Sequence, residues 1–334
     1  MKQFGATIVG TGSYTPERIL TNHDLEQMVD TSDEWIQART GIRERHIAAP
    51  QQATSDLAFE AAKSALAQAG CRADDIDLII VATISPDRPF PNTACFLQKK
   101  LGADQAACFS LEAACSGFVY ALQVAASLIR TGAHRRALVV GAEKISMFVD
   151  WQDRNTCVLF GDGAGAVVLE ATTPESDIFL AANMGADGSY AELLTVPAGG
   201  SQMPPSRQAI EAKKQYLKME GREVFKLAVN AMVESAKSVM REAGLESSQL
   251  RWLIPHQANT RIIQAVGKRL AVPEANVFMN LDKYGNTSAA TIPICLDQLN
   301  RGGHLTRGDY VLMVAFGGGL TWGASLLRWP GTEP

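Results

Sequence analysis

The 334-residue sequence lacks the patterns that identify several common protein classes. It has no run of about 18 uncharged apolar residues, so we expect no membrane-spanning helix. Basic residues are not in excess: the net charge is −4, which disfavours a protein whose whole surface binds nucleic acid. The N-terminus has no apolar segment typical of a signal peptide. We therefore expect a cytoplasmic protein that binds neither membrane nor nucleic acid.

Cysteine is scarce and does not cluster. None of the six cysteines forms a CxxC pair, and no Cys/His group has the spacing of a zinc site, so we expect no metal. Most lie among apolar neighbours, where a free cysteine packs as a small hydrophobic residue. They are Cys71, Cys95, Cys108, Cys115, Cys157 and Cys295.

The residues that are present predict an α/β fold. Apolar residues make up 46% of the chain and charged residues 20%, which is typical of a globular protein, and the length predicts about two domains or one large one. Strand and helix patterns alternate, which favours largely parallel sheets. We expect strands at 6–9, 77–82 and 137–141, and helices at 54–69 and 118–130.

The second half of the chain resembles the first. Leu78-Ile79-Ile80 matches Trp252-Leu253-Ile254, and the strand 137–140 matches 311–314, both at an offset of 174 residues. A period of half the chain predicts a duplicated fold. Any two strand–helix units share some likeness, but one offset recurs at two separate places.

We accordingly divide the chain into two similar halves, 1–172 and 173–334, around a shared site. The segment 185–220 fits neither half. It contains Gly199-Gly200 and Pro204-Pro205, and we interpret it as a surface excursion that covers a ligand entrance.

A glycine pair after the first strand is a weak candidate for a nucleotide site. Gly10-Thr11-Gly12 would need a third glycine where Thr15 stands, and Pro16 interrupts the helix that should follow. A nucleotide-binding oxidoreductase is therefore disfavoured.

Cys115 lies where a nucleophile could be placed. A strand-like stretch, 107–111, leads into small residues, then Cys115, then a helix. Unpaired backbone N–H groups at a helix start can stabilise a thiolate, and the N–H of Cys115 can help to bind an oxyanion. The alternative is a buried structural cysteine.

Three further positions lie at strand ends. His256 follows the strand 252–254 and could be catalytic or simply a hydrogen-bonded core histidine. Asn286 follows the strand-like 277–281, near the repeat position of Cys115, and could donate to an oxyanion or cap a helix. Gly318, in a run of three glycines that ends the last matched strand, 311–314, lets the backbone approach a substrate.

In combination, these motifs resemble one family. The chain is similar over nearly its whole length to β-ketoacyl-[acyl-carrier-protein] synthase III, a condensing enzyme of the thiolase superfamily. The resemblance implies a thiolase-like duplicated fold whose two similar α/β halves form a five-layered αβαβα core. The matching motifs include Asp30 to Ile36, Arg39 to Ile42, Phe160 to Gly165, His256 to Asn259, Gly285 to Ala289 and Phe316 to Gly319.

The resemblance also implies a reaction. Cys115 would take an acyl group from acyl-CoA, and His256 and Asn286 would hold the thioester oxygen of malonyl-[acyl carrier protein] while it loses CO2. The backbone N–H groups of Cys115 and Gly318 would bind the oxyanion, and Phe316 would shield the site. The product would be 3-oxoacyl-[acyl carrier protein], which initiates fatty acid synthesis, with no cofactor besides the CoA thioester.

The family's CoA site corresponds to five residues. Trp35 and Arg154 would enclose the adenine, Arg39 would meet phosphate, Thr31 would contact the adenine edge and Asn259 the pantetheine amides. Without the resemblance, helix packing for Trp35 and solvated surface for the two arginines would be preferred.

The resemblance also implies protein partners. Arg261, Lys268 and Arg269 fall on one face of a predicted helix, where the family docks acidic acyl carrier protein, with Lys226 nearby. The alternative is a solvated basic stripe. Phe90 matches the residue that the partner subunit of a homodimer contributes to the acyl pocket, and its bulk suggests a short primer such as acetyl.

Two other functions remain as alternatives. One is a related condensing enzyme of polyketide or secondary metabolism that uses only CoA thioesters and so needs no basic dock. The other, a non-enzymatic binding protein, would not need Cys115, His256 and Asn286 together.

Overall fold

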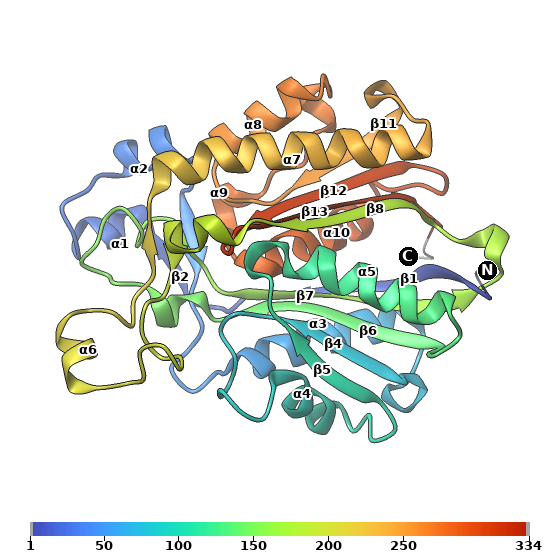
Figure 1. The fold of residues 1–334 in the computed structure, drawn as a ribbon, viewed down its shortest axis with the longest axis horizontal. Helices are drawn as coiled ribbons and strands as arrows, with labels where there is room; N and C mark the ends of the chain where they lie inside the picture. The colour runs from blue at the N-terminus through green and yellow to red at the C-terminus, as the bar shows by residue number, and fades with distance from the viewer. Residues whose placement is uncertain (1–2, 332–334) are drawn as a thin grey trace.

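The computed structural model describes residues 3–331 (Figure 1). The strands are β1 (Gly5–Tyr14), β2 (Ile19–Thr21), β3 (Glu44–His46), β4 (Leu78–Ala82), β5 (Ala107–Leu111), β6 (Arg136–Glu143), β7 (Gly163–Thr172), β8 (Phe179–Ala186), β9 (Leu194–Thr195), β10 (Lys218–Met219), β11 (Leu250–Pro255), β12 (Tyr310–Gly317) and β13 (Thr321–Arg328).

The helices connect these strands. They are α1 (Asn22–Glu26), α2 (Asp33–Thr40), α3 (Thr54–Ala69), α4 (Thr93–Leu101), α5 (Gly117–Arg130), α6 (Arg207–Glu211), α7 (Gly221–Ala243), α8 (Thr260–Arg269), α9 (Leu281–Tyr284) and α10 (Thr291–Arg301). Two short 3-10 turns matter below: η2 (Ala114–Ser116) and η8 (Ser288–Ala290).

Two sheets and three helical layers build the core (Figure 1). One sheet has the order β1-β7-β6-β4-β5 and the other the order β11-β12-β13-β8. Helices α5 and α10 lie between the sheets, α3 and α4 cover the outer face of the first sheet, and α7 and α8 cover that of the second. The five-layered αβαβα arrangement expected from the sequence is therefore the observed fold.

The two sheets repeat one connectivity. In each, a parallel pair is followed by two antiparallel neighbours: β4, β6, β7 and β1 in the first sheet, and β11, β12, β13 and β8 in the second. The expectation of largely parallel sheets is wrong, because the last strand of each half, β7 or β13, runs antiparallel to both of its neighbours. The boundary between residues 172 and 173 stays a prediction.

Several expected elements differ in detail. The strand expected at 277–281 is absent: only Val277 forms an isolated bridge, to Leu253, and Leu281 begins α9. The excursion expected at 185–220 starts later, because Gly185 and Ala186 pair with β13 as the end of β8.

Gly10 and Gly12 lie inside β1 rather than in a turn. A Cβ atom on Gly10 would lie 2.4 Å from the Ala65 carbonyl oxygen, and one on Gly12 would lie 2.3 Å from that of Ala61. Both glycines therefore let α3 pack directly against the strand, which explains the pair without a nucleotide.

Two findings bear on the excluded classes. Among residues 3–331 no helix is long and apolar enough to cross a membrane. The same part of the chain holds no group of three or more His, Cys, Asp or Glu side chains placed to bind a metal ion.

Candidate active site

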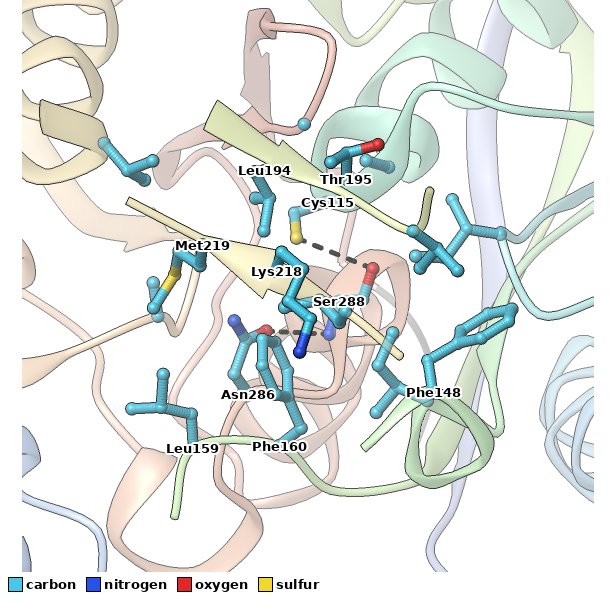
Figure 2. A pocket seen from close by; sticks show the side chains of 18 of the residues that line it. Cys115, Phe148, Leu159, Phe160, Leu194, Thr195, Lys218, Met219, Asn286 and Ser288 are labelled. Atoms are coloured by element: carbon cyan, nitrogen blue, oxygen red, sulfur yellow. Dashed lines mark hydrogen bonds between the residues drawn. The ribbon is translucent and has the colours of Figure 1, made fainter. Parts of the chain in front are cut away.

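A cavity of about 1740 Å³ lies where strand ends of the two sheets meet. Cys115, His256, Asn286, Phe316 and Gly318 all line it. The residues predicted to carry the chemistry, which come from separate segments of both halves, are thus brought together in one place. Figure 2 shows apolar side chains around the thiol, among them Phe148, Leu159, Phe160, Leu194 and Met219.

Cys115 is the central residue of η2, the turn between β5 and α5. Ala114 before it has a left-handed φ of 46°. The Gly317 end of β12 packs closely against this turn. A Cβ atom on Gly317 would lie only 2.6 Å from the Cys115 backbone nitrogen. N–H groups in the first turn of a helix have no acceptor within the helix, so that of Cys115 is available to a ligand.

The Cys115 thiol is protonated at neutral pH. Burial raises its pKa to about 12, against a smaller lowering by the hydrogen bond to Ser288. We expected the helix start to favour a thiolate, and in the free protein desolvation outweighs that effect. The Sγ atom donates to Ser288 Oγ at 3.5 Å (Figure 2).

His256 follows β11 directly and is held from both sides. Its backbone N–H donates to Val314 in β12 at 2.8 Å, and its Nδ1 lies 2.8 Å from Thr291 Oγ1. Burial lowers the pKa of the imidazole to about 3, so the ring is neutral near pH 7. Thr291 Oγ1 also lies 2.9 Å from the Ser288 carbonyl oxygen, so its single hydrogen has two alternative acceptors.

Asn286 lies two residues before η8. The equivalent position in the first half of the chain, 174 residues earlier, lies two residues before η2. Its backbone N–H donates to Leu159 at 2.8 Å, and its carbonyl accepts from Gly161 at 3.1 Å. The side-chain Oδ1 accepts from the Ser288 backbone N–H at 2.8 Å (Figure 2). Because Oδ1 is used in this way, Nδ2 is left as a donor toward the cavity.

Two arginines contact the Trp35 ring at the cavity wall. The guanidinium carbons of Arg39 and Arg154 lie 4.6 Å and 5.0 Å from the ring centroid. Arg154 also donates to the Asp30 carbonyl at 3.0 Å. The hydroxyl of Thr31 is buried with no hydrogen-bond partner. Trp35 and Arg39 line the cavity, whereas Thr31 and Arg154 do not.

Asn259 has a structural role of its own. Its Oδ1 accepts from the Arg261 backbone N–H at 2.8 Å, which caps α8, and its Nδ2 donates to the Arg39 carbonyl at 3.0 Å. It therefore joins α8 to α2 at the cavity wall.

The basic residues divide into two groups. Lys226 and Arg261 line the cavity, and Arg261 donates to the Ala38 carbonyl at 3.0 Å. Lys268 and Arg269 are exposed farther along α8, and Arg269 donates to Asn230 at 2.6 Å.

Phe90 does not line the cavity of this chain. Its side chain is 86% exposed, although the preceding Arg88 and Pro89 are lining residues. The contact of Phe90 with a partner subunit therefore stays a prediction.

Sequence reasoning missed several residues at the site. Ser288, Thr291 and the buried Glu143 form hydrogen bonds around the thiol and the imidazole, yet single hydroxyl and carboxyl residues at the ends of elements give no pattern in one sequence. The paired strands β9 and β10 also line the cavity through Leu194, Thr195, Lys218 and Met219 (Figure 2).

The chain matches known proteins along nearly its whole length. Residues 109–188 match the family model 3-oxoacyl-[acyl-carrier-protein (ACP)] synthase III, and residues 240–329 match the model of its C-terminal part. A β-ketoacyl-[acyl-carrier-protein] synthase III of Caldanaerobacter subterraneus is 53% identical over 98% of this chain and 99% of its own.

Solved structures agree with these matches. A 3-oxoacyl-[acyl-carrier-protein] synthase III from Aquifex aeolicus is 49% identical, with a TM-score of 0.90 over 97% of this chain and all of its own. The priming β-ketosynthase from the R1128 polyketide biosynthetic pathway is 35% identical, with a TM-score of 0.92 over 99% of this chain and 98% of its own. The chain therefore belongs to the β-ketoacyl-[acyl-carrier-protein] synthase III family of condensing acyltransferases, which have the thiolase fold and act in fatty acid synthesis.

Proposed function

We propose that the protein condenses a short acyl-CoA, acetyl-CoA first, with malonyl-[acyl carrier protein]. The products are 3-oxoacyl-[acyl carrier protein], CoA and CO2, and the acyl group passes through a thioester on Cys115. The observation that carries this proposal is the convergence of Cys115, His256 and Asn286 on one cavity from separate strand ends.

The first half-reaction uses the thiol. Sulfur is a strong nucleophile and also a good leaving group, so it can accept an acyl group and release it again. The oxyanion formed by its attack would be bound by the backbone N–H groups of Cys115 and Gly318, both at the cavity wall.

The second half-reaction needs neutral donors. The imidazole of His256 is uncharged near pH 7, and Asn286 offers its Nδ2. Two such donors on the malonyl thioester oxygen stabilise the enolate formed as CO2 leaves, and neither readily protonates the carbanion. This arrangement requires hydrogen on Nε2 of His256, which exists when the Thr291 hydroxyl donates to Nδ1.

Substrate contacts are assigned to two surfaces. The CoA adenine would bind at Trp35 and Arg154, with Thr31 at its edge and Arg39 at phosphate, while Asn259 would contact pantetheine. The orphan hydroxyl of Thr31 and the position of Arg39 at the cavity wall support this assignment, and Arg154 has to move off the Trp35 ring to admit the adenine.

We assign the carrier-protein dock to the basic side chains Lys226, Arg261, Lys268 and Arg269. We also propose a homodimer in which Phe90 enters the partner's acyl pocket and restricts it to short primers. Its 86% exposure in a single chain supports this role.

Intact-mass measurement tests the proposal. The protein mixed with acetyl-CoA should gain one acetyl group, and the Cys115→Ala variant should gain none. Failure to form an adduct with any short straight or branched acyl-CoA would rule out the mechanism.

A second candidate is the priming of polyketide synthesis with CoA thioesters alone; the 35% identity to a priming β-ketosynthase of a polyketide pathway supports the polyketide part of this candidate. The two are separated by the extender that is consumed. Turnover with malonyl-CoA at the rate seen with malonyl-[acyl carrier protein] would favour the second candidate.

A further inference from the structure

The buried carboxyl group of Glu143 has an unusual setting. Glu143 ends β6 and is fully buried. Its Oε2 accepts from the hydroxyls of Ser85 at 2.5 Å and Thr83 at 3.1 Å, and both oxygens accept from the Ile84 backbone N–H at 3.2 Å. These bonds hold the carboxyl group in place from the side of the 83–85 loop.

The other oxygen connects Glu143 to the nucleophile. Ser288 Oγ donates to Glu143 Oε1 at 3.0 Å and accepts from Cys115 Sγ at 3.5 Å. A continuous hydrogen-bonded path therefore runs from the thiol through one hydroxyl to one carboxyl oxygen (Figure 2 shows its first step).

The charged side chains closest to Glu143 along the chain and in the sheet form their hydrogen bonds with other groups. The Lys144 ammonium donates to the carbonyls of Ala49 and Gln52, and the Asp162 carboxylate accepts from Ser146. No ion pair to Glu143 is found within residues 3–331, and burial raises its pKa to about 7. The group can thus exist in either protonation state near neutral pH.

The proposed acyl transfer requires a place for the thiol proton. Cys115 is a thiol in the free protein, and only its thiolate is a strong nucleophile. The neutral His256 is hydrogen-bonded to Thr291 rather than to the thiol. The path through Ser288 is the one that the structure provides.

We propose that Glu143 takes the Cys115 proton by way of Ser288 during acylation and returns it during condensation. The inference rests on the acyl-Cys115 mechanism proposed above. As the S–H bond breaks, Ser288 Oγ takes that hydrogen and passes its own to Glu143, while Sγ bonds to the acyl carbon. The expelled CoA thiolate takes a proton from water.

The second half-reaction resets the path. When the carbanion bonds to the acyl carbon, the C–S bond breaks and the departing Cys115 sulfur recovers its proton from Glu143 through Ser288. In the acyl-enzyme Glu143 is a neutral acid, so no buried negative charge opposes the enolate that forms nearby. Glu143 and Ser288 act through Cys115 and are positioning and proton-relay residues.

The test is the rate of acyl-enzyme formation from acetyl-CoA, followed by rapid quench and intact mass between pH 5.5 and 9. In the wild-type protein the rate should rise with pH through about 7, as Glu143 ionises. Ser288→Ala leaves Glu143 and its loop in place but cuts the path. We expect this variant to acylate about tenfold to a hundredfold more slowly at pH 8 and to lose the rise near pH 7.

Two further variants separate the relay from a structural role. Glu143→Gln should give the same loss, and the double variant should be no slower than either single variant, because both remove one path. Ser116→Ala is the matched control: Ser116 is equally buried beside Cys115, but its hydroxyl bonds Ala113 and Thr321. We expect the control to keep the wild-type pH profile.

The outcomes are distinct. A Ser288→Ala variant that acylates at the wild-type rate with the wild-type pH profile overturns the relay. A uniform loss at every pH, or additive losses in the double variant, also overturns it in favour of a structural role. A wild-type protein that forms no adduct would instead refute the proposed function.

Discussion

His256 is a histidine that folding keeps uncharged. Its pKa falls from 6.5 to about 3 on burial, so in the unfolded chain it binds a proton at pH values where the folded chain does not. The contribution of the neutral ring to the free energy of unfolding is therefore complete above pH 6.5, and it is lost as the pH falls toward 3.

This shift predicts a pH-dependent stability difference. Relative to His256→Gln, the wild-type protein should lose about 1.4 kcal/mol of unfolding free energy per pH unit below 6.5. Urea unfolding of both proteins at pH 5, 6, 7 and 8 measures the difference. Equal slopes for the two proteins would show that His256 titrates normally when folded.

Thr291 should control which nitrogen of His256 carries hydrogen. Thr291→Val removes the hydrogen-bond partner of Nδ1, so the orientation and tautomer of the imidazole are no longer fixed, and kcat for condensation should fall on the order of a hundredfold. Acylation of Cys115 should keep its wild-type rate. Thr291→Ser, which retains a hydroxyl, should restore condensation; failure of that rescue would contradict the tautomer role.

At this scale the sequence predicted the residues that have recognisable motifs. Cys115, His256 and Asn286 follow strand patterns and match a family, so their approach to one cavity could be anticipated. Ser288, Thr291 and Glu143 could not, because their importance comes from hydrogen bonds across segments up to 173 residues apart.

The contact between α3 and β1 depends on the absence of side chains. Gly12→Ala would place a Cβ 2.3 Å from the Ala61 carbonyl oxygen, so backbone must move, and we expect a loss of about 1–3 kcal/mol in unfolding free energy. Gly188→Ala is the control, because no atom lies within 4 Å of its new Cβ. Urea denaturation should show no change larger than about 0.5 kcal/mol for the control. Equal effects would mean that packing is not the cause.

Elements with strong local patterns were predicted best. The apolar stripe and Gly70 located α3 at 54–69 as observed, because a C-terminal glycine in the left-handed region ends the helix. The mixed direction of the sheets was not predicted, since a buried strand has the same apolar residues in either direction. The strand predicted at 277–281 was wrong for a related reason: apolar residues do not by themselves show whether a segment pairs, and here only Val277 forms a bridge.

The distribution of charge over the whole molecule has a kinetic consequence. The net charge of −4 coexists with the exposed Lys268 and Arg269 beyond the cavity. Reversing both to Glu should raise KM for malonyl-[acyl carrier protein] about tenfold at low salt and leave acylation by acetyl-CoA unchanged. The control is the single reversal Arg72→Glu. This exposed cation precedes β4 and so lies at the end of the strand away from the cavity. Equal effects of the two changes would argue against a local dock.

The layered architecture could be predicted because the repeat indicated two copies of one unit and the family resemblance implied the five layers. The cavity's apolar wall from β9 and β10 was not, because two-residue strands leave no periodic pattern.

Ala114 and Ser288 occupy the same place in the two halves, 174 residues apart, and both have a left-handed backbone, with φ of 46° and 51°. For residues with a side chain this conformation lowers stability. It recurs at the first residue of η2 and of η8, next to Cys115 and close to Asn286. Directed evolution for heat resistance should therefore readily find changes at these two turns, and those changes should trade activity for thermal tolerance. A thermally more stable enzyme that keeps its activity should therefore be sought by substitutions elsewhere in the chain, with both turns unchanged.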